Sequence, residues 1–492
     1  MIWKIAKKEI LLNLMTFKFA MGTMLCMVLT AVFVPILAKA YQERLKTYND
    51  NVAYNEAELR KVTVYKNITP TIYRSPAVLA VFSEGLEKQL GNSATIEYDK
   101  VPEISVAAAN HYLSIFSIFD ASLIFKIVIS VLALLVAYDA ISGERERGTL
   151  RLMLSGTMAR YQVLLGKLLA GLMVLVVPVT IVFILGLVIL LCFPMVDLAG
   201  SDWIRIGFMF LASLVFITTM YNLGLLFSCL AKRSAISLVL GLFVWIVFVV
   251  VIPNGSVYLA TQIRPVQSED KVNQQIALLR RDAQREFMRD LQISGRSIQS
   301  GGRRSDMPGR GGFGHGYVRS CDKVFMENNL IRYGIGVPIE IKYADKYSEV
   351  KYGYLRGLFE QTRLANNLSR ISPIYLYENV MSVLAGTDMA SIQHFIDGVK
   401  ANRNDIIEYM RSKTNNFSSS SFFTPCTKEE TELPPISDDA PPLDLRDLPR
   451  FIYKADIVGS LRRVIPDLAL LIFGSVLFFA MAFVAFVRYD VR

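Results

Sequence analysis

Residues 139–150 read DAISGERERGTL, a densely charged stretch between two long apolar runs at 116–136 and 168–193. Arg160 and Lys167 add further positive charge before the second run begins. A helix of about 20 apolar residues crosses the hydrocarbon core of a bilayer, and each flanking run has about this length. A charged hairpin between two such runs does not fit the interior of a soluble domain. We therefore expect it at a membrane face, where another protein can contact it.

Apolar residues gather in blocks along the whole chain. They make up 53% of the 492 residues, a content too high for an ordinary soluble enzyme. Backbone that faces lipid must satisfy its own hydrogen bonds, so each block is expected to be a helix. The sequence thus predicts an all-α polytopic membrane protein with six transmembrane helices, over residues 16–40, 116–138, 164–193, 203–230, 235–253 and 467–487.

The short loops between these spans differ in charge. The turn at 194–202 contains two aspartates and no lysine or arginine, whereas the N-terminus, the hairpin at 139–163 and the turn at 232–233 are basic. Positive residues favour the cytoplasmic side, so both termini are expected inside. Residues 1–15 are expected to form an amphipathic helix on that surface. A simple extension of the first span explains them equally well.

Two long polar segments, 41–115 and 254–466, remain for the opposite side of the membrane. Their composition favours helices, so we expect a large, mainly helical extracytoplasmic domain. Two stretches within it, 294–316 and 415–449, are rich in Gly, Ser or Pro and are expected to be flexible.

Cysteine and charge patterns add little further chemistry. Cys321 and Cys426 both fall in the 254–466 segment and could form a disulfide if that segment lies outside the cytoplasm. The chain has no CxxC pair and its three histidines are scattered, so no metal site is predicted. The net charge of +10 fits the cytoplasmic edges of a membrane protein better than nucleic-acid binding, for which no motif is present.

Few polar side chains lie inside the predicted spans. Asp120 and Lys126 come nearest to an intramembrane relay, but their spacing places them on different helix faces. An uncharged group in the fourth span could form hydrogen bonds between packed helices or, alternatively, line a substrate path. Its members are Thr218, Thr219, Tyr221 and Asn222.

The tip of the charged hairpin carries both signs of charge beside a helix-ending glycine. Gly148 is expected to end the helix that leaves the second span, and Thr149 can cap the next helix. Such a surface suits docking into a groove of a cytoplasmic protein. A charged turn that merely keeps the membrane edge hydrated explains the same residues equally well. The candidate docking residues are Glu144, Arg145, Glu146, Arg147, Gly148 and Thr149.

A nucleotide-binding loop of the form GxxxxGK[ST] is absent. Gly166-Lys167 is followed by Leu168, and Tyr161 stands where the first glycine belongs. No motif of a serine hydrolase or a zinc protease is present either. We therefore expect that the chain does not bind ATP itself and is not an enzyme.

Two blocks of sequence resemble ABC-2 type permeases, the membrane subunits of ABC transporters. The first is residues 139–150 together with Leu165-Gly166-Lys167. The second is SCLAKRSA at 228–235, followed by Trp245. The ending at 486–492 is similar to the tails of members with a large outer domain. The resemblance covers all six predicted spans.

This resemblance implies a permease moved by a separate ATPase subunit, which holds the ATP and Mg²⁺; no cofactor is expected in this chain. Two permeases, either identical or related, would pair with two ATPases. Residues 144–150 would form the coupling helix and residues 1–15 the elbow helix. It also implies an exporter in the lipid bilayer of a prokaryotic plasma membrane. A second hypothesis is a membrane-anchored sensor or assembly scaffold, since 41–115 and 254–466 together exceed half the chain.

Overall fold

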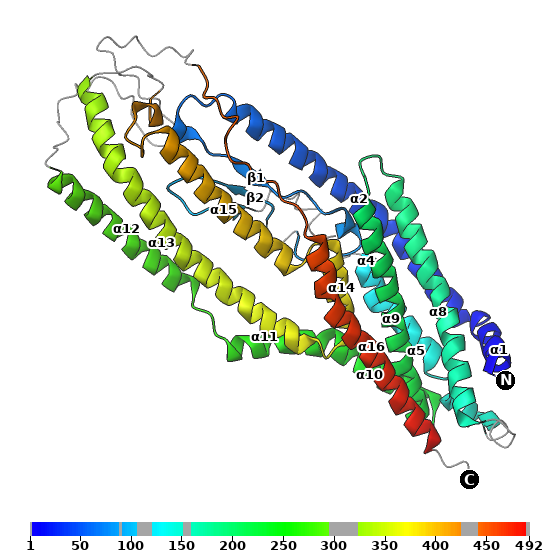
Figure 1. The fold of residues 1–492 in the computed structure, drawn as a ribbon. Coiled ribbons are helices and arrows are strands. Elements are labelled where there is room, and N and C mark those ends of the chain that lie inside the picture. The colour runs from blue at the N-terminus through cyan, green and yellow to red at the C-terminus, as the bar shows by residue number, and fades with distance from the viewer. Residues whose placement is uncertain are drawn as a thin grey trace.

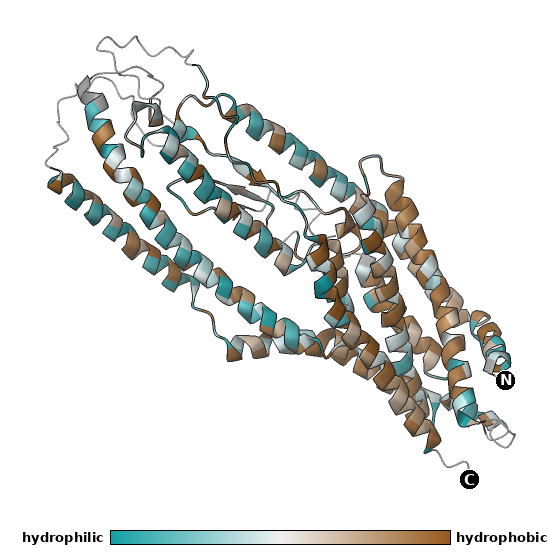
Figure 2. Cartoon of the chain, in the orientation of Figure 1, coloured by the Kyte–Doolittle hydropathy of each residue, from teal (hydrophilic) through white to brown (hydrophobic). Residues whose placement is uncertain are grey.

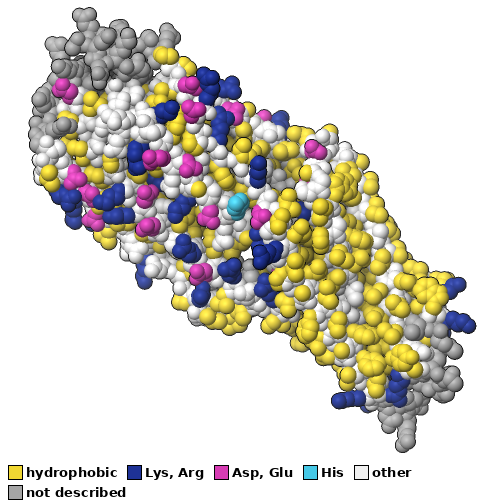
Figure 3. All heavy atoms as spheres, in the orientation of Figure 1, with side chains coloured by type: hydrophobic (Ala, Val, Ile, Leu, Met, Phe, Trp, Pro, Cys, Tyr) yellow, Lys and Arg dark blue, Asp and Glu magenta, His cyan; other side chains and the backbone are white. Residues whose placement is uncertain are grey.

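The computed structural model describes residues 2–87, 91–105, 121–150, 159–294, 323–424 and 441–488. The molecule is elongated, and both chain termini lie at the same end of it (Figure 1). Apolar helices form this terminal end, whereas the opposite half is polar (Figure 2). Figure 3 shows the same division on the surface, with apolar side chains over one half and mixed acidic and basic side chains over the other.

Six helices among the described residues are long and apolar enough to cross a membrane. They are α2 (Phe17–Leu59), the run Ile124–Glu146, α8 (Arg160–Leu191), α9 (Gly200–Leu230), the run Ser234–Ile263 and α16 (Ile457–Val487). The run at 124–146 joins the π-helical turn η4 (Ile124–Ile129), α5 (Ser130–Ala137) and α6 (Ser142–Glu146). The run at 234–263 joins α10 (Ser234–Ile246), the π-helical turn η5 (Val247–Val251) and α11 (Ile252–Ile263). The chain is thus a multi-pass membrane protein, and the predicted helical class and number of spans are confirmed.

Some helices continue past the apolar stretches that predict them. α2 runs on to Leu59, because the helix-forming residues after position 41 extend it into the polar half. α16 likewise begins at Ile457, ten residues before the predicted start of the sixth span at 467. Short helices α1 (Ile2–Leu14) and α4 (Ala121–Leu123) precede the first and second spans. Continuous helices therefore link the apolar and polar halves.

Helix α9 lies at the centre of the apolar half. It packs against α5, α8, α16 and α14 (Pro373–Ala385), and 67% of its most apolar window is buried. Phe216 of α9 stacks on Tyr377 of α14 with ring centroids 4.5 Å apart. Ser213 Oγ lies 3.1 Å from the Tyr377 hydroxyl. In sequence, α14 lies between two long helices of the polar half, at 323–369 and 389–413, so it anchors that half on the membrane helices.

Helices α12 (Glu269–Ile293), α13 (Lys323–Ser369) and α15 (Met389–Lys413) form most of the polar half (Figure 1). This half also contains a small antiparallel sheet that the sequence does not predict. Its strands are β1 (Thr71–Tyr73), β2 (Ser93–Thr95) and β3 (Ile104–Ser105), in that order, with Thr71 opposite Thr95 and Ser93 opposite Ser105. Single helical turns η1 (Tyr65–Asn67), η2 (Val78–Val81) and η6 (Ser420–Phe422) complete it.

A separate hydrophobic core holds the polar half together. Phe417 and Phe422 are fully buried there, beside Phe395 of α15. Both belong to the beginning of the 415–449 stretch that the sequence marks as flexible, so this beginning packs into the domain. Cys321 and Cys426 lie outside the described residues, as does residue range 295–316 of the other stretch.

Glu286 on α12 makes one polar contact between that helix and α13. Its carboxylate accepts hydrogen bonds from Lys342 Nζ at 2.7 Å and from the Tyr343 hydroxyl at 3.0 Å, and these bonds lower the pKa of Glu286. Because the folded-state pKa is lowered, the bonds stabilise the fold at neutral pH, and this contribution is lost as pH falls through the folded pKa. We expect the distribution of distances between spin labels on α12 and α13 to broaden slightly below about pH 4, because an exposed pair of this kind contributes at most about 1 kcal/mol.

Glu286→Gln should show the same slight broadening already at pH 7, because its neutral amide lacks the charge that Lys342 pairs with. A label distance that stays sharp both at low pH and in this variant would mean that other contacts hold α12.

Candidate functional site

The charged hairpin lies at the terminal end and is fixed to the end of α9. Ser228 Oγ of α9 accepts hydrogen bonds from the backbone N–H of Ile141 at 2.9 Å and of Ser142 at 3.1 Å. Ser228 and Ser142 are both fully buried. The first backbone N–H groups of a helix have no partner within it, and this hydroxyl supplies one for α6. The start of α6 is thereby positioned on α9.

Arg145 makes a second connection from α6 to α9. Its guanidinium donates to the carbonyl oxygens of Ala231 at 2.8 Å and Cys229 at 3.2 Å. These carbonyls belong to the end of α9, where the last carbonyl groups of a helix lack intrahelical partners, and a cation interacts favourably with them. Arg145 therefore points inward, toward the membrane helices.

Lys167 of α8 is the buried centre of the hairpin's contacts. Its side chain is only 2% exposed, and its Nζ lies 2.9 Å from Glu9 Oε1 and 2.8 Å from Glu144 Oε1. A buried charge is tolerated only with close partners of opposite charge. This ion cluster, Glu9–Lys167–Glu144, joins α1, α8 and α6.

The backbone of the same lysine is fixed by α9. The Tyr221 hydroxyl donates to the Lys167 carbonyl oxygen at 2.9 Å, and Tyr221 is 2% exposed. Its ring packs directly on Gly171, one turn further along α8. A small residue here lets α8 and α9 approach closely, as is common between membrane helices.

The six predicted docking residues divide into two groups. Glu144 and Arg145 are engaged within the chain, as described above. The other four are exposed and form what we call the hairpin tip, residues 146–149. Gly148 has a φ of 72°, which a glycine adopts without strain, and it ends the segment after α6. Within the tip, Glu146 accepts a hydrogen bond from Ser234 Oγ at 2.5 Å, and Thr149 Oγ1 donates to the Glu144 carbonyl at 3.2 Å.

The four polar residues of the fourth span mostly bond to neighbouring helices. Thr219 Oγ1 lies 3.2 Å from the Leu471 carbonyl of α16, and Asn222 Nδ2 donates to Ser475 Oγ of α16 at 3.0 Å. Tyr221 bonds to α8, and Thr218 bonds to Leu214 within α9 itself. These contacts are of the kind that the helix-packing hypothesis expects, while the side-chain oxygen of Asn222 is buried without a hydrogen-bond partner among the described residues.

Lys126 has a partner that sequence spacing does not indicate. Its Nζ lies 2.5 Å from Glu378 of α14, while Asp120 is outside the described residues. Sequence reasoning also misses Glu9 and Ser228. A signal for Glu9 is present, since it is the only acidic residue among the first 42 and stands in an otherwise basic helix.

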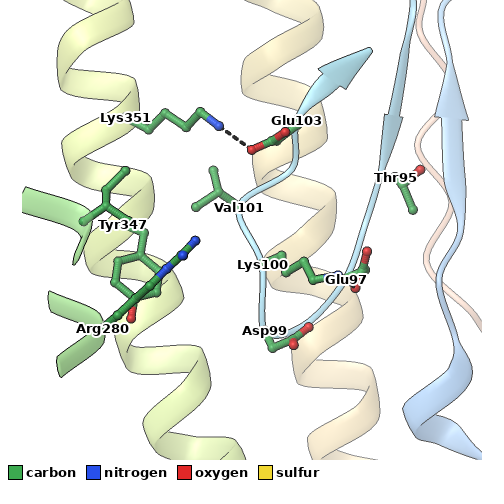
Figure 4. A pocket seen from close by; sticks show the side chains of 10 residues that line it. Thr95, Glu97, Asp99, Lys100, Val101, Glu103, Arg280, Tyr347 and Lys351 are labelled. Atoms are coloured by element: carbon green, nitrogen blue, oxygen red, sulfur yellow. Dashed lines mark hydrogen bonds and ion pairs between the residues drawn. The ribbon is translucent and has the colours of Figure 1, made fainter. Parts of the chain in front are cut away.

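Figure 4 shows another candidate, a cavity of about 530 Å³ in the polar half between the β2–β3 connection and helices α12 and α13. Its charges are largely matched. Lys351 Nζ lies 2.5 Å from Glu103, and Lys100 Nζ lies 2.6 Å from Glu97. Burial raises the pKa of Asp99 in the same loop. The described residues contain no group of three or more His, Cys, Asp or Glu that could hold a metal ion.

Comparison with known proteins places the chain in a family. A family model described as "ABC-2 family transporter protein" matches residues 3–491. Over 125 residues, 25% of this chain and 44% of the relative, it is 40% identical to "Probable ABC transporter permease protein NosY" of Stutzerimonas stutzeri. The identically named protein of Pseudomonas aeruginosa is 40% identical over 123 residues, 24% of this chain and 43% of that protein. The matched part thus spans less than half of either relative, whereas the family model spans almost the whole chain. The chain belongs to the ABC-2 transporter family.

Proposed function

We propose that the chain is the membrane subunit of an ATP-driven transporter, and that a separate ATPase subunit moves it by docking on the hairpin tip. The observation that carries this proposal is the way α6 is mounted. It is bound to α9 through Ser228 and Arg145 and to α1 and α8 through Lys167. Because these contacts attach α6 directly to α1, α8 and α9, a displacement of the exposed tip would move these three helices as well.

The energetic requirement is differential binding. Nucleotide bound by the ATPase can shift the permease between two conformations only if the docked ATPase favours one of them. A shift from 1:99 to 99:1 needs a difference of about 5.5 kcal/mol between the two states. The tip is attached to α8, α9 and α1, so moving it changes the contacts of all three helices. Docking can therefore change the relative free energies of the two permease conformations.

Arg147→Glu tests the docking surface directly. Arg147 is exposed, with no acidic partner among the described residues, so its reversal is expected to leave the fold intact. We expect the amount of co-purified ATPase to fall about tenfold, because a like-charge contact at an interface costs at least about 1.4 kcal/mol. The measurement is pull-down of a co-expressed ABC ATPase subunit from the same organism, normalised to the yield of the chain.

The matched control is Arg281→Glu on α12. This arginine is also exposed and has no described acidic partner, but it lies in the polar half, far from the tip. It should retain wild-type association. Equal recovery of the ATPase with Arg147→Glu and Arg281→Glu would remove the tip from the proposed docking surface.

The proposal extends to a second permease copy or a related chain. The fifth span, Ser234–Ile263, supports it because only 11% of its apolar window is buried within the chain. Phe243 and Val239 there are 62% and 66% exposed, so lipid or a second span must cover them. Native mass spectrometry of the complex should give two permeases with two ATPases, and a single permease with one ATPase would contradict this.

Export across a prokaryotic plasma membrane is the direction and location that the resemblance implies.

A membrane-anchored scaffold is the alternative that one observation favours. The polar half has a hydrophobic core of its own and includes a 47-residue helix, α13. If scaffolding were the function, cells with an ATPase variant unable to hydrolyse ATP would have the wild-type phenotype. Under the transporter proposal, that variant should reproduce the phenotype of deleting the chain.

A further inference from the structure

A cleft of about 840 Å³ opens where the polar half meets the apolar half. It is bounded by the second part of α13, the beginning of α15, the end of α14 and the first turns of α16. Figure 1 shows α13 and α15 converging on the start of α16 at this level. From Leu468 onward α16 is apolar, so the cleft lies at one edge of the membrane-spanning part, away from the chain termini.

Acidic side chains in the cleft are already paired. Asp467 is 1% exposed and lies 2.8 Å from Arg370 Nε, and it also accepts a hydrogen bond from Asn379 Nδ2 at 2.6 Å. Asp388 lies 3.6 Å from Arg463 Nε. Glu360, which also lines the cleft, lies 2.7 Å from Arg264, a residue outside the lining. These pairs fix the walls and leave no acidic group in the lining to neutralise a further cation.

Three lining arginines remain without an acidic partner among the described residues: Arg356, Arg363 and Arg462. All three are exposed. Arg356 and Arg363 are seven residues apart on α13, which places them on the same helix face about 10 Å apart along its axis. Arg462 faces them from α16 across the same cleft. Figure 3 shows basic side chains gathered at the boundary between the apolar and mixed halves of the surface.

Apolar side chains stand exposed next to this charge. Ile371 follows Arg370 and is 72% exposed, and Ile465 follows the arginine pair of α16 and is 64% exposed. Phe473, two turns further along α16 into the apolar half, is 64% exposed. A site with cationic groups above and apolar groups below matches an amphiphile with an anionic head. The cavity of Figure 4 differs, because its lysines are paired with its glutamates.

We propose that this cleft binds the phosphate headgroup of an anionic phospholipid, in the leaflet on the side away from the termini. Guanidinium groups bind phosphate oxygens through paired, charge-assisted hydrogen bonds. Basic pockets between membrane helices bind anionic headgroups on the cytoplasmic side of membranes, and the same guanidinium chemistry is available in this cleft. The lipid would bridge α13 and α16 and so couple the polar half to the sixth span. This inference does not depend on what the complex transports.

The test uses the full chain purified in a neutral detergent and short-chain phosphatidylglycerol as the probe. We expect saturable binding of phosphatidylglycerol and at least about tenfold weaker binding of phosphatidylcholine, because each basic residue at a membrane surface favours an anionic lipid by roughly a factor of five. The variant Arg356→Gln/Arg363→Gln/Arg462→Gln should lose at least about tenfold in affinity for phosphatidylglycerol. Replacing the same three residues by lysine should restore most of the binding.

The matched control is Arg280→Gln/Arg281→Gln/Arg332→Gln, which removes the same charge from exposed positions of α12 and α13 in the polar half. It should bind phosphatidylglycerol like the wild type. Equal loss in the two triple variants would overturn the site and indicate an effect of net charge alone. Binding of glycerol phosphate as tight as that of phosphatidylglycerol would overturn the lipid assignment, because a soluble anion would then suffice. Unchanged binding in the cleft variant, with an unchanged melting temperature, would also overturn it.

Discussion

Replacing Lys167 by methionine is expected to destabilise the folded chain by about 3–5 kcal/mol, the usual result of removing one partner from a buried ion pair. The substitution leaves Glu9 and Glu144, which both lie within 3 Å of the same Nζ, facing each other without a cation. Their side chains are only 17% and 20% exposed, so water cannot replace the lost charge well. The expected result is unfolding at a clearly lower fraction of SDS in mixed micelles.

A rescue variant separates charge from packing. Adding Glu9→Gln and Glu144→Gln to Lys167→Met removes the uncompensated charges and should recover most of the lost stability, since a neutral replacement of a whole buried cluster is often tolerated. Lys7→Met, an exposed lysine on α1, is the control and should change nothing. If Lys167→Met unfolded at the same SDS fraction as Lys7→Met, the ion cluster would not exist in the folded protein.

The membrane spans could be predicted from the sequence because crossing a bilayer is a local property. A run of about 20 apolar residues is visible without knowing what it contacts. The composition of segments 41–115 and 254–466 likewise favours helices, and the structure continues α2 to Leu59 and forms α12 over Glu269–Ile293. Helix ends were harder to place, because a polar helix can continue an apolar one without any break in helix-forming residues.

Contacts between distant residues could not be predicted. Lys167 and Glu9 are 158 positions apart, and Lys126 and Glu378 are 252 positions apart. The sequence shows that each of these charged residues lies in or beside an apolar run. Which residue of opposite charge it contacts depends on how the helices pack. For Lys126, spacing argued against a pair with Asp120, but it gave no indication of Glu378. The strands of the small sheet have two or three residues each, too few for an alternating pattern.

The docking residues illustrate the same limit. One charged motif was recognised as a unit, yet the fold divides it. Glu144 and Arg145 serve the interior, and the hairpin tip serves the surface. The positions of α8 and α9 decide which side chains of α6 are covered, and the sequence of the hairpin alone does not give these positions. A charge reversal at Glu144 would therefore disturb the ion cluster together with any docking contact, whereas Arg147→Glu tests docking without touching the cluster.

Gly171→Ala is expected to disrupt the contact between α8 and α9. A Cβ at this position would lie 2.1 Å from Tyr221 Cζ and 2.4 Å from its hydroxyl oxygen, so the ring must move. Overpacking of this kind costs about 1–3 kcal/mol. Displacing the ring also breaks its hydrogen bond to the Lys167 carbonyl, a loss of about 1 kcal/mol. Together these losses exceed the roughly 1 kcal/mol by which alanine favours a helix over glycine, so unfolding is expected at a lower SDS fraction.

The matched control is Gly207→Ala on α9, where a Cβ would meet nothing within 4 Å. Alanine favours helix over glycine by about 1 kcal/mol, so this variant should be neutral or slightly more stable. Tyr221→Leu combined with Gly171→Ala should recover part of the lost stability, because the smaller side chain makes room for the new methyl group. Since Tyr221 positions the backbone of Lys167, Gly171→Ala should also reduce ATPase co-purification, although the hairpin tip itself is unchanged. A Gly171→Ala chain as stable as Gly207→Ala would show that α8 and α9 are further apart than these contacts require.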